Sequence, residues 1–377
     1  MLRRLERKES GKSNCVDMPF SRLKKIIPGF EPFTYSIISA NQKVGKTKLT
    51  DYMFVYKPIL ERVLLRNTSL KTHCLYFSLE ESEARKEYAF YSHLLYSIDK
   101  IRIEPQLLTS VSGRMPRWVV EKLDSPIYQQ CIQDFENNVE YIEDIKNPTG
   151  IYKYCKDYSS RNGKYNTVMG KKYDEVTGTY YETEVLDKKN PLTWNDPDTY
   201  HIIIIDNFAN LATERGWTLK ETIDKMSKYC IELAKLGFIV IGVQHQQQAQ
   251  EGLEAQKYGK ITPSVDGLGD AKTTARDVNL VLGLFSPSRF NIPSYGGYDI
   301  TQWKDRIRFL SILAARDYRM DGTTQIPLLF RGDVSHFEEL PRPENTMELD
   351  AILRQLDEEE RQISLLHTQQ NSQQTNG

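Results

Sequence analysis

The stretch from Ser36 to Thr47, which reads Ser-Ile-Ile-Ser-Ala-Asn-Gln-Lys-Val-Gly-Lys-Thr, constrains the fold of this chain more than any other. A short apolar run leads into a loop that ends in Gly-Lys-Thr, and the residues from Lys48 to Leu60 can form a helix. Phosphate-binding loops occur in this order of strand, loop and helix, because backbone N–H groups and the helix N-terminus then face the phosphates. We therefore predict a P-loop at residues 40–47.

The residue types in this loop predict how it would hold ATP. Lys46 would reach the β- and γ-phosphates, and the Thr47 hydroxyl would ligate Mg²⁺. The residues expected around the nucleotide are Ala40, Asn41, Gln42, Lys43, Val44, Gly45, Lys46 and Thr47. Ala40 stands where the usual pattern begins with glycine, so it fits only if its backbone keeps φ negative. The alternative is an ordinary strand-to-helix turn.

The composition describes a globular protein. A chain of 377 residues with 39% hydrophobic and 27% charged residues can hold one large α/β domain or two small ones. The formal net charge of −1 gives no global positive field, so contact with nucleic acid must come from local basic loops. No apolar run approaches the roughly 18 residues of a membrane span, and the five scattered cysteines suit a reducing cytosol. We expect a cytoplasmic protein that does not contact a membrane.

Apolar runs along the chain predict a mostly parallel sheet flanked by helices. The strongest run is His201–Asp206, whose four consecutive isoleucines indicate a strand buried on both faces. The other expected strands are 73–79, 238–243, 278–284, 308–316 and 326–330, the last at the sheet edge because of Pro327. Helices are expected at 82–98, within 100–150, at 218–236 and at 346–367, and a long polar loop at 249–275.

Composition also suggests boundaries for the domains. Residues 1–17 are polar and predict a flexible arm, and residues 18–341 predict one ATPase domain. Residues 151–198, rich in Tyr, Gly, Lys and Asp, predict an insertion with a small hairpin at 176–181. Residues 342–377 predict a C-terminal helix followed by a disordered tail at 368–377.

Polar residues at the carboxyl ends of the expected strands are the catalytic candidates, since parallel sheets bind ligands at that edge. Asp206 could hold the Mg²⁺ site together with Thr47. Glu80, or less favourably Glu81, could activate water, because Asn207 leaves no carboxylate beside Asp206. Gln244 or His245 could sense the γ-phosphate, depending on a register that the sequence does not fix.

Arg316 ends a late strand and is a candidate arginine finger for the nucleotide of a neighbouring subunit. A local ion pair with Asp317, or Arg319 in the same role, is the alternative. Candidate DNA-binding loops are 207–218 and 246–276. The basic residues of the second loop are Lys257, Lys260, Lys272 and Arg276.

The sequence resembles the RecA-like ATPase domain of DnaB-type replicative helicases, particularly the divergent versions of tailed phages. The matching motifs, in the family's order, are Ala40–Thr47, Phe77–Glu80, Ile202–Asp206, Val240–His245, Asp270–Asp277 and Leu310–Phe330 with Phe337–Leu340. The family usually has Lys at the place of Ala314, and the 151–198 segment is not part of its common pattern.

The resemblance implies a homo-hexameric ring that hydrolyses MgATP between subunits, with single-stranded DNA in its channel. It also implies primase or other replisome proteins as partners, in the host cytoplasm if the protein is phage-encoded. Two other functions are compatible with the residues: a RecA-like recombinase or single-strand-binding ATPase, and a non-catalytic P-loop scaffold or virion protein.

Overall fold

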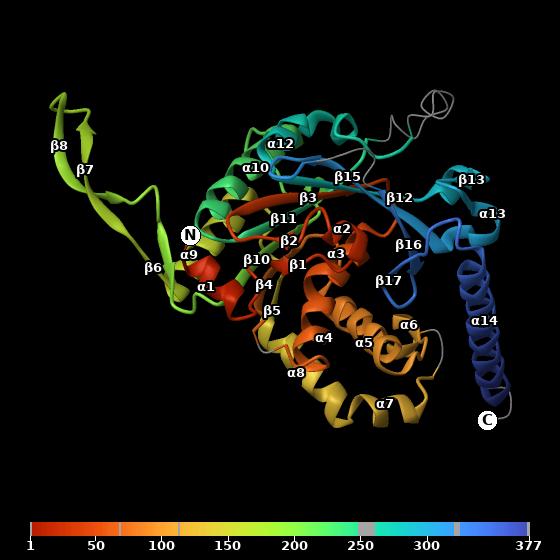
Figure 1. Ribbon diagram of the computed structural model, residues 1–377. Coiled ribbons are helices and arrows are strands. Elements are labelled where there is room, and N and C mark those ends of the chain that lie inside the picture. The colour runs from red at the N-terminus through yellow and green to blue at the C-terminus, as the bar shows by residue number, and fades with distance from the viewer. Residues whose placement is uncertain (1, 68, 112–113, 248–260, 320–324, 375–377) are drawn as a thin grey trace.

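The fold is built on a nine-stranded sheet with the order β17-β16-β15-β12-β3-β11-β10-β4-β5 (Figure 1). The structure is a computed structural model, and it describes all residues except 1, 68, 112–113, 248–260, 320–324 and 375–377. The parallel strands are β3 (Thr34–Ala40), β4 (Lys71–Ser78), β5 (Val139–Ile142), β10 (Thr199–Asp206), β11 (Ile239–His245) and β12 (Leu280–Phe285). The antiparallel strands are β15 (Ile307–Ala315), β16 (Gln325–Arg331) and β17 (His336–Glu339). The sheet is mostly parallel, as predicted.

The four isoleucines of β10 show why this strand lies in the interior. Successive side chains of a strand point to opposite faces. Ile202 and Ile204 pack into the hydrophobic core on one face of the sheet, and Ile203 and Ile205 pack into the core on the other. The prediction of a strand buried on both faces is confirmed.

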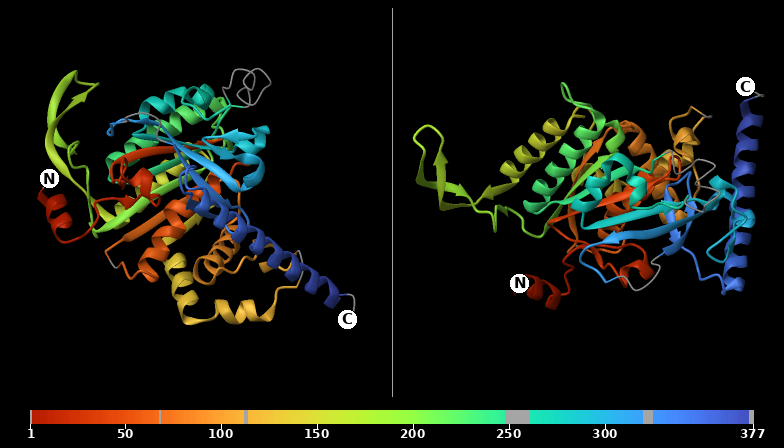
Figure 2. Two further views of the ribbon diagram at one scale, coloured as in Figure 1. Left: turned by 45° about the vertical axis from the view of Figure 1, so that its right-hand side comes forward. Right: turned by 90° about the horizontal axis from the view of Figure 1, so that it is seen from above.

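Helices cover both faces of the sheet (Figures 1 and 2). One face carries α3 (Lys46–Asp51), the π-helix η1 (Tyr52–Tyr56), α4 (Lys57–Val63), α5 (Glu83–Asp99), α6 (Pro105–Leu108), α7 (Arg117–Leu123) and α8 (Pro126–Asn138). The other face carries α9 (Pro148–Asn162), α10 (Leu219–Lys235) and α12 (Lys272–Asp277). The helices predicted at 82–98 and 218–236 are α5 and α10. α10 begins at a capping box, in which Thr218 Oγ1 accepts the Glu221 N–H and Glu221 Oε2 accepts the Thr218 N–H.

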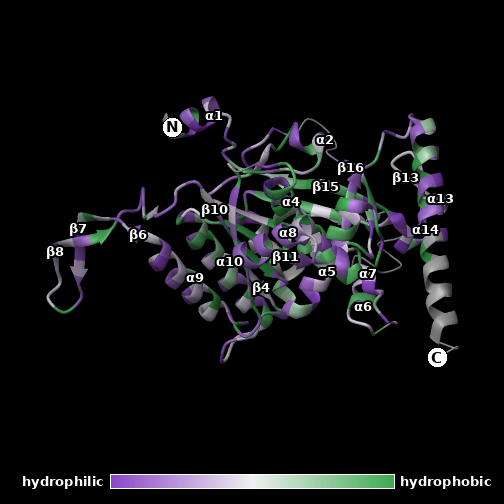
Figure 3. Ribbon diagram, turned by 90° about the horizontal axis from the view of Figure 1, so that it is seen from below, coloured by the Kyte–Doolittle hydropathy of each residue, from purple (hydrophilic) through white to green (hydrophobic). Residues whose placement is uncertain are grey.

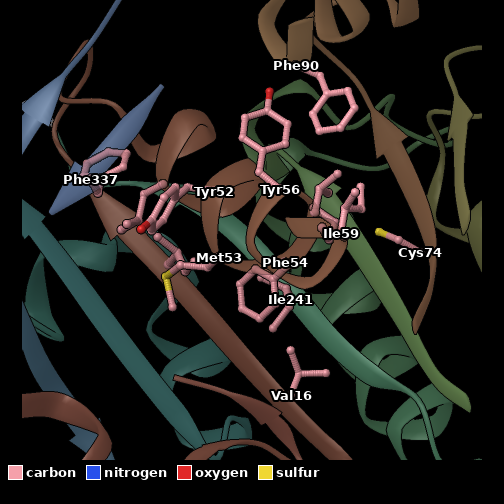
Figure 4. Close-up of a cluster of buried hydrophobic side chains, with 14 of the residues drawn as sticks. Val16, Tyr52, Met53, Phe54, Tyr56, Ile59, Cys74, Phe90, Ile241 and Phe337 are labelled. Carbon is pink, nitrogen blue, oxygen red and sulfur yellow. The ribbon is translucent and has the colours of Figure 1, made fainter. Parts of the chain in front are cut away.

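The core below the P-loop helix is aromatic. Figure 4 shows Tyr52 and Tyr56 of η1 directed toward neighbouring elements. The Tyr56 ring lies 5.3 Å from that of Phe90 in α5, and the Tyr52 ring 5.7 Å from that of Phe337 in β17, between centroids. Because this core joins α3 to both α5 and β17, it holds the helix that follows the P-loop in a fixed position. Figure 3 shows hydrophobic residues along the central strands and hydrophilic ones on α1.

The 151–198 segment differs from its prediction. It begins inside α9, whose buried Ile151, Cys155 and Tyr158 lie on one face of a helix packed against α10. The small hairpin predicted at 176–181 is longer: β7 (Thr167–Asp174) pairs with β8 (Thr179–Leu186) and projects from the body of the protein (Figures 1 and 2). Its base is the pair β6 (Gly163–Tyr165) and β9 (Leu192–Trp194).

Two further strand predictions need correction. The segment 100–150 contains β5 as well as helices, and β5 forms one edge of the sheet. The predicted edge strand 326–330 is β16, which is not an edge, since β17 pairs with its outer side. Pro327 removes one N–H from the ladder, but its carbonyl still accepts the Leu340 N–H at 3.1 Å.

The two ends of the chain are largely helical. The predicted N-terminal arm contains α1 (Leu2–Glu9), which is tied to the body by an ion pair between Arg7 and Asp198. At the other end α14 (Thr346–Gln374) continues through most of the stretch predicted to be disordered. The domain boundaries themselves stay predictions. No helix in the described part of the chain is long and apolar enough to cross a bilayer.

The remaining elements are short and connect the main ones. They are β1 (Val16–Asp17), α2 (Ser21–Lys24), β2 (Gly29–Phe30), η2 (Phe208–Asn210), η4 (Asp266–Ala271), η5 (Pro287–Phe290), β13 (Ser294–Tyr295), β14 (Tyr298–Asp299), α13 (Ile300–Trp303) and η6 (Lys304–Arg306). η4 and α12 occupy part of the long loop predicted at 249–275.

Candidate active site

The predicted P-loop connects β3 to α3 at the carboxyl edge of the parallel strands. Gly45 has φ +103°, and a Cβ there would lie 2.9 Å from Cζ of Phe330, so only glycine fits. Ala40 is the last residue of β3, it does not have a positive φ, and its carbonyl accepts the Gln246 N–H at 2.9 Å. Alanine in place of the usual glycine is therefore compatible with this loop, as the sequence required.

Two arginines that the sequence analysis did not single out donate hydrogen bonds to backbone carbonyls of the P-loop. Arg308 of β15 is 1% exposed, donates from Nε to the Val44 carbonyl at 2.8 Å and lies over the Phe330 ring. Arg289 of η5 donates to the Gln42 carbonyl. Because these carbonyls accept hydrogen bonds from the two arginines, the N–H groups of the loop can face an anion.

Lys46 is 5% exposed and contacts the end of β11. Its Nζ lies 2.9 Å from Nδ1 of His245 and 3.3 Å from the Asn41 carbonyl. Gln244 points elsewhere, since its Nε2 donates to the Leu268 carbonyl at 3.1 Å. Of the two residues proposed for sensing phosphate, the structure brings His245 to Lys46, and Gln244 contacts the loop that follows β11.

Asp206 lies at the end of β10 and is 3% exposed. Its Oδ2 accepts the Tyr76 hydroxyl at 3.0 Å, and its buried Oδ1 has no hydrogen-bond partner within the described residues. Thr47 is the second residue of α3. A carboxylate oxygen with no other partner is the kind of ligand that Mg²⁺ or its bound water prefers. Asp206 therefore fits the metal-supporting role expected of it.

Glu80 and Glu81 follow β4 and face different partners. Exposed Glu80 accepts from Nδ2 of Asn207 at 2.8 Å. Asn207 is 2% exposed, and its Oδ1 accepts the Ala209 N–H at 3.0 Å. Oε2 of Glu81 instead lies 3.5 Å from Nζ of Lys86. Asn207, which at the sequence level only marked the absence of a carboxylate, orients the Glu80 side chain.

Arg316 lies near the amino ends of the parallel strands, whereas the P-loop lies at their carboxyl ends. β15 runs antiparallel to β12, so its last residue, Ala315, pairs with Leu280 at the start of β12. The Arg316 side chain is exposed and donates to the Arg276 carbonyl. The Asp317 carboxylate accepts from Asn279 Nδ2 at 3.1 Å rather than from Arg316. The Arg316 side chain is therefore placed away from the P-loop of its own chain.

The proposed DNA-binding residues are only partly described. Lys257 and Lys260 lie outside the described residues. Lys272 begins α12, and Arg276, near its end, is exposed. This region is anchored to the site, since Gln246 donates to Ser39 Oγ at 2.8 Å and its Oε1 accepts the Ser264 N–H at 3.2 Å.

A cavity of about 770 Å³ opens beside the P-loop helix, between α3, α5, α6 and the β16–β17 turn. Lys48 and Asp51 line its α3 side, and Arg85 and Tyr88 line its α5 side. Burial lowers the pKa of Lys48, whose ammonium group donates to the Gly332 carbonyl. A space of this size next to a phosphate-binding loop can hold the nucleoside part of a nucleotide.

The comparison with known proteins finds similarity at the level of structure. No family model matches the chain, and no curated protein matches it. A DnaB-like replicative helicase, described with its interactions with primase, aligns with a TM-score of 0.59 and 14% identity. A second solved structure, which consists of the ATPase domain of another protein, aligns with a TM-score of 0.56 and 13% identity. The chain has the fold of a DnaB-type ATPase domain.

The alignments also show how much of each protein this DnaB-type fold accounts for. They cover 90% of this chain in both cases, 97% of the second protein's ATPase domain and 66% of the DnaB-like helicase. This chain therefore spans slightly less than two thirds of that helicase. At this level of identity the similarity establishes the RecA-like fold alone.

Proposed function

We propose that the protein is an ATP-dependent DNA helicase of the DnaB type, which hydrolyses MgATP at subunit interfaces and moves along single-stranded DNA. The observation that carries this proposal is the arrangement at one sheet edge, where Lys46 contacts His245 and Asn207 orients Glu80. Asp206 lies buried at the same edge with one carboxylate oxygen that has no partner among the described residues. A phosphate-binding lysine, a metal-supporting carboxylate and an oriented base are the groups that ATP hydrolysis needs.

Each residue has a distinct role in the proposed reaction. Lys46 binds the β- and γ-phosphates, and the P-loop N–H groups surround them. Mg²⁺ held near Thr47 and Asp206 would neutralise charge on the phosphates. Glu80, fixed by the Asn207 amide, accepts a proton from the attacking water.

His245 is suited to report the state of the nucleotide. Its Nδ1 contacts Lys46, the residue that a γ-phosphate would engage. Its neighbour Gln244 holds the Leu268 carbonyl in the segment that leads to α12. A change at Lys46 when phosphate leaves would therefore reach the end of β11 and then the 246–276 loop, which we assign to DNA through Lys272 and Arg276.

The position of Arg316 supports assembly into a ring, which we propose to be a homo-hexamer as in the helicase class. This residue lies at the end of the parallel strands opposite the P-loop, so it can serve a nucleotide only in a neighbouring subunit. There it would act as an arginine finger that stabilises transition-state charge. Single-stranded DNA would occupy the channel, a primase or another replisome protein would be a partner, and the host cytoplasm would be the place of action.

Two observations favour a catalytic protein over a P-loop scaffold. Ala40 is accommodated in the strand without strain, and the oriented Glu80 provides a base. A recombinase would share the same site, and what distinguishes the two is strand separation rather than strand exchange.

The test is ATP hydrolysis by the purified full-length chain, with and without single-stranded DNA, followed by unwinding of a forked duplex. We expect DNA-stimulated turnover that Lys46→Ala abolishes, together with unwinding. Turnover that survives Lys46→Ala would contradict the P-loop assignment. Strand exchange without unwinding would favour the recombinase.

A further inference from the structure

Lys86 is a charged side chain in an unusual place. It lies in the first turns of α5 and is 1% exposed. Lysine on a helix at the protein surface normally keeps its ammonium group in water, and a buried charge is costly unless it is paired and hydrogen-bonded. The groups that surround Lys86 therefore account for its position.

Lys86 connects four elements that converge below the active site. Its Nζ donates to the two carboxylate oxygens of Asp51 in α3, at 2.9 and 3.1 Å, and to the Tyr76 hydroxyl in β4 at 2.9 Å. The Tyr76 hydroxyl in turn lies 2.8 Å from Asp51 Oδ1 and 3.0 Å from Asp206 Oδ2. Nζ of Lys86 is also 3.8 Å from Asp206 Oδ2 and 3.5 Å from Glu81 Oε2.

The effect of this network on Asp206 depends on which carboxylate accepts the hydrogen of the Tyr76 hydroxyl. A tyrosine hydroxyl has one hydrogen to donate. Asp51 Oδ1 and Asp206 Oδ2 both lie within reach of this hydrogen. Asp51 already accepts from Lys86 at both oxygens, whereas Asp206 Oδ2 has no other hydrogen-bond donor among the described residues. Donation from Tyr76 to Asp206 Oδ2 therefore leaves fewer acceptors without a partner.

We propose that Tyr76 and Lys86 are positioning residues that fix the Asp206 carboxylate, with Oδ2 held by the Tyr76 hydroxyl and Oδ1 left for the Mg²⁺ site. This inference rests on the proposed function, because it concerns how the same site uses its metal. Lys86 also places its positive charge among the carboxylates of Asp51, Glu81 and Asp206, which offsets their mutual repulsion.

A simpler account treats Lys86 as the ion-pair partner of Asp51 and Tyr76 as a core residue. That account predicts effects on stability alone. Positioning predicts, in addition, that the gain in nucleotide affinity from Mg²⁺ depends on Tyr76. The two accounts are separated by measuring affinity for a fluorescent ADP analogue in EDTA and over a MgCl₂ titration.

Tyr76→Phe removes only the hydroxyl group and keeps the ring. We expect affinity for the analogue in EDTA to stay within about two-fold of wild type, and the MgCl₂ concentration for half-maximal effect to rise about ten-fold or more, as loss of a hydrogen bond to a charged group implies. Tyr141→Phe is the matched control, since its ring lies 5.0 Å from that of Tyr76 and its buried hydroxyl has no hydrogen-bond partner among the described residues. It should leave the titration unchanged.

Lys86→Met leaves two buried carboxylates without their cation and can unfold the protein, so it is compared with Lys86→Met combined with Asp51→Asn. The double variant removes the charge imbalance and should recover most of the melting temperature. It should still need about ten-fold more MgCl₂ than wild type if Lys86 acts through Asp206. Recovery of both stability and the wild-type titration would leave Lys86 with a structural role only and overturn its assignment.

The remaining outcomes separate this inference from the proposed function. If Tyr76→Phe binds the analogue with the wild-type MgCl₂ dependence, positioning by Tyr76 is wrong while the proposed function stands. If wild type binds the analogue neither in EDTA nor with MgCl₂, the proposed function fails, and this inference fails with it.

Discussion

The hydrogen bond from Asn207 to Glu80 gives a quantitative prediction about catalysis. Asn207→Ala removes a 2.8 Å bond to the carboxylate that we assign as the base. A hydrogen bond to a charged group contributes about 1.5–3 kcal/mol, which as a loss of transition-state stabilisation corresponds to about 10–150-fold in rate. Because Glu80 is exposed, water can replace part of the bond, so we expect a decrease in kcat near the lower end, about ten-fold.

The assay is steady-state ATP hydrolysis at saturating MgATP and single-stranded DNA. KM for ATP should change little, because Asn207 orients the base and does not contact the nucleotide in the proposed scheme. Asn210→Ala is the control, since Asn210 is exposed in the same short turn. Melting temperatures of both variants show whether folding is preserved.

Asn207→Asp adds a second test. It replaces the donating amide with a carboxylate that repels Glu80. The value of kcat should therefore fall at least as far as in Asn207→Ala. A wild-type kcat for Asn207→Ala, or a loss that appears only in KM, would refute the assignment of Glu80 as the base held by Asn207.

Three further predictions follow from the same structure. Glu80→Gln should keep nucleotide binding and slow hydrolysis about 100-fold or more in single-turnover assays, and normal turnover would remove Glu80 as the base. Mixing Arg316→Ala subunits with Lys46→Ala subunits should restore part of the ATPase rate that each lacks alone, whereas inactive mixed oligomers would contradict a finger acting between subunits. Burial lowers the pKa of His93 from 6.5 to about 4 and of His201 to about 3, so the unfolded chain takes up these protons first as pH falls. The free energy of unfolding from urea titrations should therefore decrease below pH 6.5, by at most about 1.4 kcal/mol per histidine per pH unit. The lowered pKa values of His73 and His336 act in the same direction, and the raised pKa of Asp51 acts in the opposite direction. A flat profile would contradict the burial of His93 and His201 in neutral form.

The parts of the fold that the sequence predicted are those with a strong local signal. The isoleucine run of β10 and the P-loop context each specify an element without knowledge of their neighbours. α9 was missed although Ile151, Cys155 and Tyr158 have helical spacing, because the whole 151–198 segment was interpreted from its composition. β5 has only four residues between helices, and an edge strand that short carries little periodic signal.

The site was predictable in its residue types but not in its contacts. The strand ends indicated Asp206, Glu80 and the Gln244–His245 pair, because side chains at the carboxyl edge must meet. The choice of His245 over Gln244 as the neighbour of Lys46 depends on the register of β11 against β3, which pairing across the sheet sets. Arg308 binds the P-loop carbonyl of Val44, which is 264 residues away in the sequence, so no local pattern marks this arginine.

The antiparallel course of β15 has a mechanical consequence. The strand has nine residues, and at about 3.3 Å per residue it extends for nearly 30 Å. Near one end of the strand, Arg308 donates a hydrogen bond to the P-loop of its own subunit. Directly beyond the other end, the Arg316 side chain is exposed. In the ring proposed above, this strand would form a rigid connection of fixed length between the nucleotide site of its own subunit and that of the neighbouring subunit. A displacement of one P-loop would then push or pull the arginine at the next site, so that neighbouring sites would turn over in sequence rather than independently.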